Sequence, residues 1–145
     1  MSTTITVETA IEAPPERVWE VLTDFPGYPT WNPFVTRITG ELHPGARLRV
    51  AIKPQPGREM TFRPTVRHVD EGRGFSWLGR LLVPGLFDGL HSFETGPHPD
   101  GGTLFRQSET FSGLLALVAG GSLEGTRRGF HAMNEALAVR CRQPR

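Results

Sequence analysis

The chain has 145 residues, the size of one domain, and its 16 basic and 15 acidic residues leave a formal charge of +1, which gives no electrostatic reason to expect a nucleic-acid partner. The lone Cys141 excludes an internal disulfide, and no apolar stretch approaches the roughly 18 residues of a membrane-spanning helix. The first residues lack the basic and apolar regions of a secretory signal, so we expect a single cytoplasmic domain over 1–145 without an integral membrane segment.

The N-terminal third predicts a strand followed by two short helices. Residues 5–11 alternate between apolar and polar types, and this period of two predicts a half-buried strand. Prolines 14 and 15 suit the first turn of a helix, and Pro26-Gly27 ends it. Pro29 is placed to start a second short helix, and Pro33 to end it.

Six further strands are expected before the C-terminal segment. Their connecting turns are too short for parallel crossovers, so the sheet should be antiparallel. Pro64 cannot donate to a strand ladder, and we therefore predict a bulge near it. The segments are 35–41, 47–52, 60–67, 75–79, 86–95 and 103–111.

The last segment, 122–141, predicts one long amphipathic helix. Its apolar residues recur at helical spacing, and no proline interrupts it before Pro144. A helix of that length is roughly 30 Å long and needs a broad surface to cover its apolar face. The apolar face holds Leu123, Phe130, Met133, Leu137 and Cys141.

Several stretches resemble one family of proteins. The opening 13–19 and 29–34, and the later blocks 89–94, 107–113 and 129–137, are similar to the bacterial polyketide cyclase/dehydrase and lipid-transport group. This group belongs to the SRPBCC or helix-grip superfamily, with the Bet v 1 allergens and START domains. The resemblance implies an α+β helix-grip fold, in which a seven-stranded curled antiparallel sheet wraps around the long C-terminal helix. Two short helices follow strand 1, and a cavity opens between sheet and helix.

The implied cavity and the strand alternation together select candidate ligand-binding residues. Most are apolar, and His91, Gln107, Glu109 and Asn134 are the polar exceptions. An apolar pocket with a few convergent polar groups is typical of a small-molecule site, so we expect a lipid, isoprenoid or polyketide-like ligand. The candidates are Phe62, Phe75, Trp77, Phe87, Phe93, Phe105, Gln107, Phe111, Phe130 and Asn134.

His91 and Glu109 are candidates for chemistry. Hairpin pairing places His91 opposite either Gln107 or Glu109, and either arrangement leaves all of them within reach. The alternative function is therefore a cyclase or dehydratase that transfers protons through His91 and Glu109. A buried His bonded to a carboxylate also serves as a structural pair that fixes strand register. Burial would raise the pKa of Glu109 and a charged His91 would lower it.

Other features of the sequence suggest no metal or cofactor. No pair of histidines has metal-ligand spacing with a third ligand nearby, so no metal and no other cofactor is expected. The apolar, glycine-bounded segments 83–87 and 114–121 are candidate gates of the cavity. A third possible function is that of a partner-binding module with a filled core. The sequence does not predict the oligomeric state.

Overall fold

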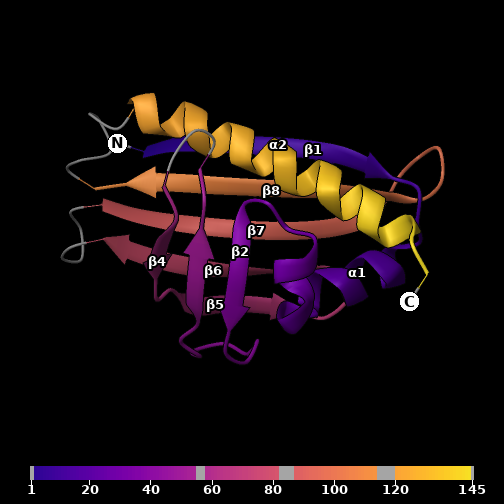
Figure 1. Ribbon diagram of the computed structural model, residues 1–145, viewed down its shortest axis with the longest axis horizontal. Helices are drawn as coiled ribbons and strands as arrows, with labels where there is room; N and C mark the ends of the chain where they lie inside the picture. Colours follow the sequence, from indigo (N-terminus) through magenta and orange to yellow (C-terminus); the bar gives the residue numbers. More distant parts are fainter. Residues whose placement is uncertain (1, 55–57, 82–86, 114–119, 145) are drawn as a thin grey trace.

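A computed structural model describes residues 2–54, 58–81, 87–113 and 120–144. The fold is α+β, with two short helices after the first strand and a long helix at the end of the chain (Figure 1). Both candidate gates lie largely outside the described residues, as does the side chain of Phe87. The elements are β1 (Ser2–Ile11), α1 (Pro15–Thr23), η1 (Phe25–Thr30), β2 (Val35–Thr39), β3 (Arg49–Ile52), β4 (Met60–Phe62), β5 (Thr65–Asp70), β6 (Gly74–Leu81), β7 (Phe87–Pro97), β8 (Thr103–Ser112) and α2 (Gly120–Arg142).

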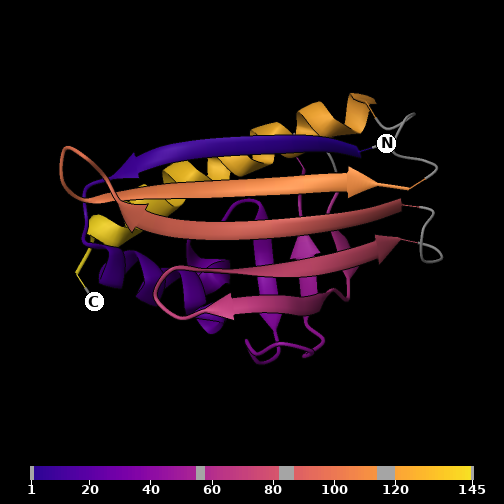
Figure 2. The ribbon, with the colours of Figure 1, turned by 180° about the vertical axis from the view of Figure 1, so that it is seen from behind.

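The strands form two antiparallel sheets. The larger has the order β1-β8-β7-β6-β5, and the smaller has the order β2-β3-β4. An isolated bridge between Arg47, which precedes β3, and Thr65 of β5 connects the two sheets at one edge. In Figures 1 and 2 the larger sheet forms one layer. Helix α2, the short helices and the smaller sheet form a second layer on one face of it. This arrangement is the helix-grip fold, with the interior between the two layers.

The predicted strand 60–67 is wrong as one element, because it is divided into β4 and β5. Proline has no N–H to donate, and the ladder stops at Arg63–Pro64. The Pro64 carbonyl oxygen instead accepts a hydrogen bond from the backbone N–H of Leu48 at 2.9 Å. The register of β5 against β6 also shifts between Val66 and His68. The described residues therefore form eight strands, where the sequence predicted seven.

The second short helix also differs from its predicted position. It is a 3-10 helix over Phe25–Thr30, directly after α1, whereas the prolines predicted it to run from Pro29 to Pro33. Asn32 explains the early end. Its side-chain oxygen accepts hydrogen bonds from the backbone N–H groups of Phe34 and Val35, at 3.0 and 2.9 Å. This turn leads the chain into β2.

Helix α2 covers the interior with the apolar face that its spacing predicts. Phe130, Met133, Leu137 and Cys141 are at most 5% exposed. Gly129 lets the Phe34 ring approach, because a Cβ atom there would lie 2.2 Å from a carbon of that ring. Among the described helices, none combines the length and apolar character that a membrane span requires.

Candidate functional site

Several aromatic rings pack against one another in the interior. The rings of Phe75 and Phe93 have centroids 4.7 Å apart, and Trp77 lies 4.9 Å from Phe93. These three side chains, with Phe105 and Phe130, are at most 2% exposed. The structure therefore brings five of the predicted ligand-binding residues together as one packed cluster.

A row of three residues crosses this inner surface. Trp77 on β6 pairs with His91 on β7, and His91 pairs with Glu109 on β8. Because side chains alternate along a strand, partners in register lie on the same face of the sheet. The indole N–H of Trp77 has no hydrogen-bond partner among the described residues, although the side chain is buried. The row therefore holds an unpaired donor within a largely apolar interior.

His91 begins a chain of buried hydrogen bonds that ends on β1. Its Nε2 lies 2.8 Å from Oε1 of Gln107, whose Nε2 donates to Oδ1 of Asn134 at 2.7 Å. The Asn134 Nδ2 donates to the carbonyl oxygen of Val7 at 3.3 Å and contacts the Thr9 hydroxyl oxygen at 3.1 Å. The chain joins three strands to helix α2.

On its other side, the imidazole of His91 faces Glu109. The separation of Nδ1 and the carboxyl Oε1 is 3.8 Å, which is longer than a hydrogen bond. The ring also stacks on Phe93, with centroids 4.2 Å apart, and lies 4.8 Å from the ring of Phe130. His91 is thus opposite Glu109 in the ladder and bonded diagonally to Gln107, so both partners that the sequence left open are within reach.

Burial acts in opposite directions on the two titratable groups. It lowers the pKa of His91 to about 4, against a smaller upward effect of the Gln107 hydrogen bond. It raises the pKa of Glu109 to about 8. Near neutral pH the imidazole is therefore uncharged and the carboxyl group is mostly protonated. The sequence did not show whether burial, which raises the pKa of Glu109, or a charged His91, which lowers it, has the larger effect. In the structure the effect of burial is larger.

Two facing glycines make room for neighbouring side chains, Gly89 for Glu109 and Gly79 for Phe62. Gly79 and Gly89 face each other across β6 and β7, next to the His91 row. A Cβ atom on Gly89 would lie 2.5 Å from Oε2 of Glu109, and one on Gly79 would lie 3.1 Å from the ring of Phe62. The Glu109 side chain is 16% exposed, against 4% for His91, so the row becomes accessible at its β8 end.

The contribution of these glycines was missing from the predicted site. Their alternation with Trp77 and His91 in the sequence is the signal that could have found them, because a strand glycine often marks a close approach. Phe62 and Phe111, both predicted to bind ligand, lie at this end of the interior. Phe62 is partly buried beside Gly79, and a carbon of the Phe111 ring would be 3.7 Å from a Cβ atom on Gly89.

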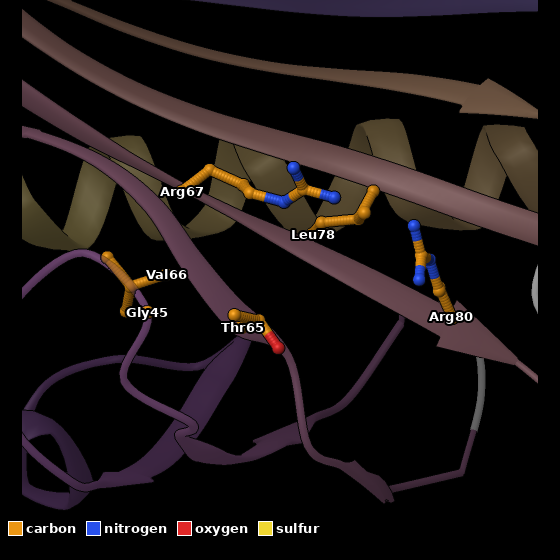
Figure 3. Close-up of a pocket in the computed structure, with 6 residues that line it drawn as sticks. All are labelled: Gly45, Thr65, Val66, Arg67, Leu78 and Arg80. Atoms are coloured by element: carbon orange, nitrogen blue, oxygen red, sulfur yellow. The ribbon is translucent and has the colours of Figure 1, made fainter.

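Two hollows in the described structure lie away from this row. One, of about 390 Å³, is on the outer face of β5 and β6, where Arg67, Leu78 and Arg80 lie with α2 behind the strands (Figure 3). The other, of about 440 Å³, is lined by residues of β2, β3 and β4, including Arg37, Arg49 and Glu59. Within the described ranges, no three His, Cys, Asp or Glu side chains gather as metal ligands would.

Comparison with solved structures places the fold among known relatives. The Zhui aromatase/cyclase from Streptomyces sp. R1128 is 18% identical, with a TM-score of 0.78 over 97% of this chain and 94% of that one. The ginseng major latex-like protein 151 from Panax ginseng is 11% identical, with a TM-score of 0.79 over 99% of each chain. At these identities the likeness shows the fold alone.

A third relative is a larger protein. The di-domain ARO/CYC protein BexL is 16% identical, with a TM-score of 0.74 over 99% of this chain. This chain spans only 51% of BexL. No curated protein matches at the level of sequence. The family described as polyketide cyclase/dehydrase and lipid transport matches residues 2–143, so the chain belongs to that family.

Proposed function

We propose that the protein binds a small hydrophobic molecule between the larger sheet and α2, at the end where Glu109 lies beside Gly89. The observation that carries the proposal is the partial exposure of Glu109 on an inner row that is otherwise buried. Gly79 and Gly89 face each other there, and the space above them is taken by the Phe62 ring and the Glu109 carboxyl group, which could move to admit a ligand. Apolar surroundings with one polar contact are the usual form of such a site. A lipid, an isoprenoid and a polyketide-like compound all have the required apolar surface.

Native mass spectrometry of the full chain, purified from its own host, tests this proposal. We expect a retained mass that extraction into organic solvent releases, and its identification would name the ligand class. The proposal fails if the protein carries no extra mass and if neither palmitate nor 2-naphthol changes its tryptophan fluorescence on titration.

One observation favours a second candidate function, proton-transfer catalysis on a polyketide-like substrate. His91 and Glu109 have pKa values displaced in opposite directions and face each other at 3.8 Å. Groups arranged in this way act as base and acid near neutral pH. The variant Glu109→Gln keeps hydrogen-bonding atoms but cannot exchange a proton. Under this candidate it binds substrate within about threefold of the parent affinity and loses turnover, whereas a carrier shows no turnover in either form.

A further inference from the structure

The buried hydrogen bonds determine which ring nitrogen of His91 carries its proton. A backbone carbonyl can only accept, so the side-chain group of Asn134 that faces the Val7 oxygen must be its NH2. The Asn134 oxygen therefore faces Gln107, and this oxygen accepts from the Gln107 NH2 group. The Gln107 oxygen is left to face His91. Because that oxygen also only accepts, the proton of the imidazole is on Nε2.

Among the described residues, the other nitrogen of His91 is then an acceptor without a partner at hydrogen-bond distance. The ring is uncharged near neutral pH, because burial lowers its pKa to about 4. Its Nδ1 has a lone pair, and the carboxyl Oε1 of Glu109 lies 3.8 Å away. Glu109 is protonated under the same conditions, because burial raises its pKa to about 8. A bare acceptor and a carboxylic acid thus face each other at 3.8 Å, too far apart to bond directly.

We propose that Nδ1 of His91 and the carboxyl group of Glu109 together bind the hydroxyl group of an apolar ligand, such as a phenol or an alcohol. A hydroxyl group donates to one partner and accepts from the other. An oxygen placed about 2.8 Å from each atom closes a triangle on their 3.8 Å separation. The inference rests on the proposed function and adds the ligand class. Gln107 and Asn134 are the positioning residues that keep Nδ1 bare.

Other oxygen groups satisfy only half of this arrangement. A carbonyl or an ether oxygen accepts from the Glu109 acid but has no proton for His91 Nδ1. A carboxylate has the same defect and also brings a charge into the apolar interior. The site should therefore distinguish a hydroxyl group from its methyl ether, although the two place an oxygen at the same position.

Three probes that share the naphthalene ring test the preference. We would titrate the full chain with 2-naphthol, 2-methoxynaphthalene and 2-methylnaphthalene and follow binding by calorimetry. We expect 2-naphthol to bind about tenfold more tightly than 2-methoxynaphthalene, since the two differ by one buried hydrogen bond, and 2-methylnaphthalene, which makes neither bond, to bind most weakly. Equal affinities would overturn the hydroxyl inference and leave the proposed function standing. Binding of none of the three would overturn the hydroxyl inference, and the proposed function would fall with it only if the protein also retained no mass and did not respond to palmitate.

A histidine variant tests whether His91 causes the preference for a hydroxyl group. His91→Phe keeps a flat ring against Phe93 and Phe130 and removes Nδ1. We expect 2-naphthol and 2-methoxynaphthalene to bind this variant with equal affinity, because both still accept from Glu109, and the control His131→Phe, at an exposed position on α2, to keep the tenfold preference. A preference that survives in a folded His91→Phe protein would overturn the assignment.

Nitrogen NMR of the histidine rings tests the positioning residues without relying on affinity. In the parent protein we expect His91 to show a protonated Nε2 and a bare Nδ1, with the Nδ1 resonance moving when 2-naphthol binds. In Asn134→Leu nothing fixes the Gln107 amide, and we expect a mixture of both tautomers in a protein whose backbone spectrum shows it folded. A proton on Nδ1 in the parent, or an unmixed Nε2 tautomer in Asn134→Leu, would contradict the proposal.

Discussion

The carboxyl group of Glu109 occupies the space above Gly89 on the neighbouring strand, where a Cβ atom on the glycine would lie 2.5 Å from Oε2. Gly89→Ala must therefore displace this carboxyl group. The displaced atoms are the end of a flexible side chain, so we expect the fold to survive with a loss of at most about 1 kcal/mol in unfolding free energy. Affinity for 2-naphthol should fall by about tenfold, as measured by calorimetry, because Glu109 no longer lies beside His91.

Gly96→Ala is the matched control for that variant. Gly96 belongs to the same strand, and a Cβ atom there would meet nothing within 4 Å. We expect this substitution to change neither stability nor naphthol affinity. If both variants reduce affinity equally, the space above Gly89 has no special role in binding.

The raised pKa of Glu109 predicts a loss of stability at alkaline pH. The folded protein keeps this proton up to about pH 8, whereas the unfolded chain releases it near 4.5, so the stabilisation is full below pH 4.5 and is lost as pH rises through 8. His91 has the opposite sign: its stabilisation is full above pH 6.5 and is lost as pH falls through about 4. Between pH 6.5 and 9, therefore, Glu109 alone of the pair lowers the unfolding free energy, by about 2 kcal/mol.

Urea unfolding at pH 6.5 and at pH 9 measures this difference. Glu109→Gln resembles the protonated acid and has no proton to lose, so its curve should lack the alkaline decrease. The control Glu135→Gln, at an exposed position on α2, should keep the decrease seen in the parent protein. A parent protein as stable at pH 9 as at pH 6.5 would show that Glu109 titrates near its ordinary pKa.

Gly129 on α2 should tolerate no larger residue. In an exposed helix, alanine in place of glycine stabilises by roughly 0.5–1 kcal/mol. Here its Cβ atom would lie 2.2 Å from the ring of Phe34, which is 1% exposed and packs against Phe130. We expect Gly129→Ala to lower the unfolding free energy by about 2–3 kcal/mol in urea titrations. The same substitution in a Phe34→Leu background should cost clearly less; an equal cost would exclude this contact as the cause.

The alternation and helical spacing in the sequence were enough to predict the order of the elements and the face of α2 that is buried. The errors are local. A proline marks a break in the ladder, but sequence alone did not show whether the strand bends at Pro64 or ends there. The second short helix was misplaced because the Asn32 side chain closes a turn that the spacing of the prolines does not reveal.

The sequence was enough to predict which residues lie near His91, but not their distances or the orientation of their amide groups. Hairpin pairing brought His91, Gln107 and Glu109 together, because short-loop hairpins restrict the register to a few choices. The length of the His91–Glu109 separation and the direction of each amide depend on Asn134 and Val7, which are distant in sequence. The close approach of Glu109 to Gly89 could not be predicted either, because a glycine in a strand does not indicate which side chain lies above it.

The amide of Asn134 also determines where α2 rests along its own axis. One side chain on the helix is bonded to β1 through Val7 and to β8 through Gln107. Sliding the helix by one turn, about 5.4 Å, would break every one of these bonds at once. The helix is therefore locked against translation near its middle. A change in length at the N-terminal end of the helix would therefore leave these bonds, and the His91 that they orient, in place.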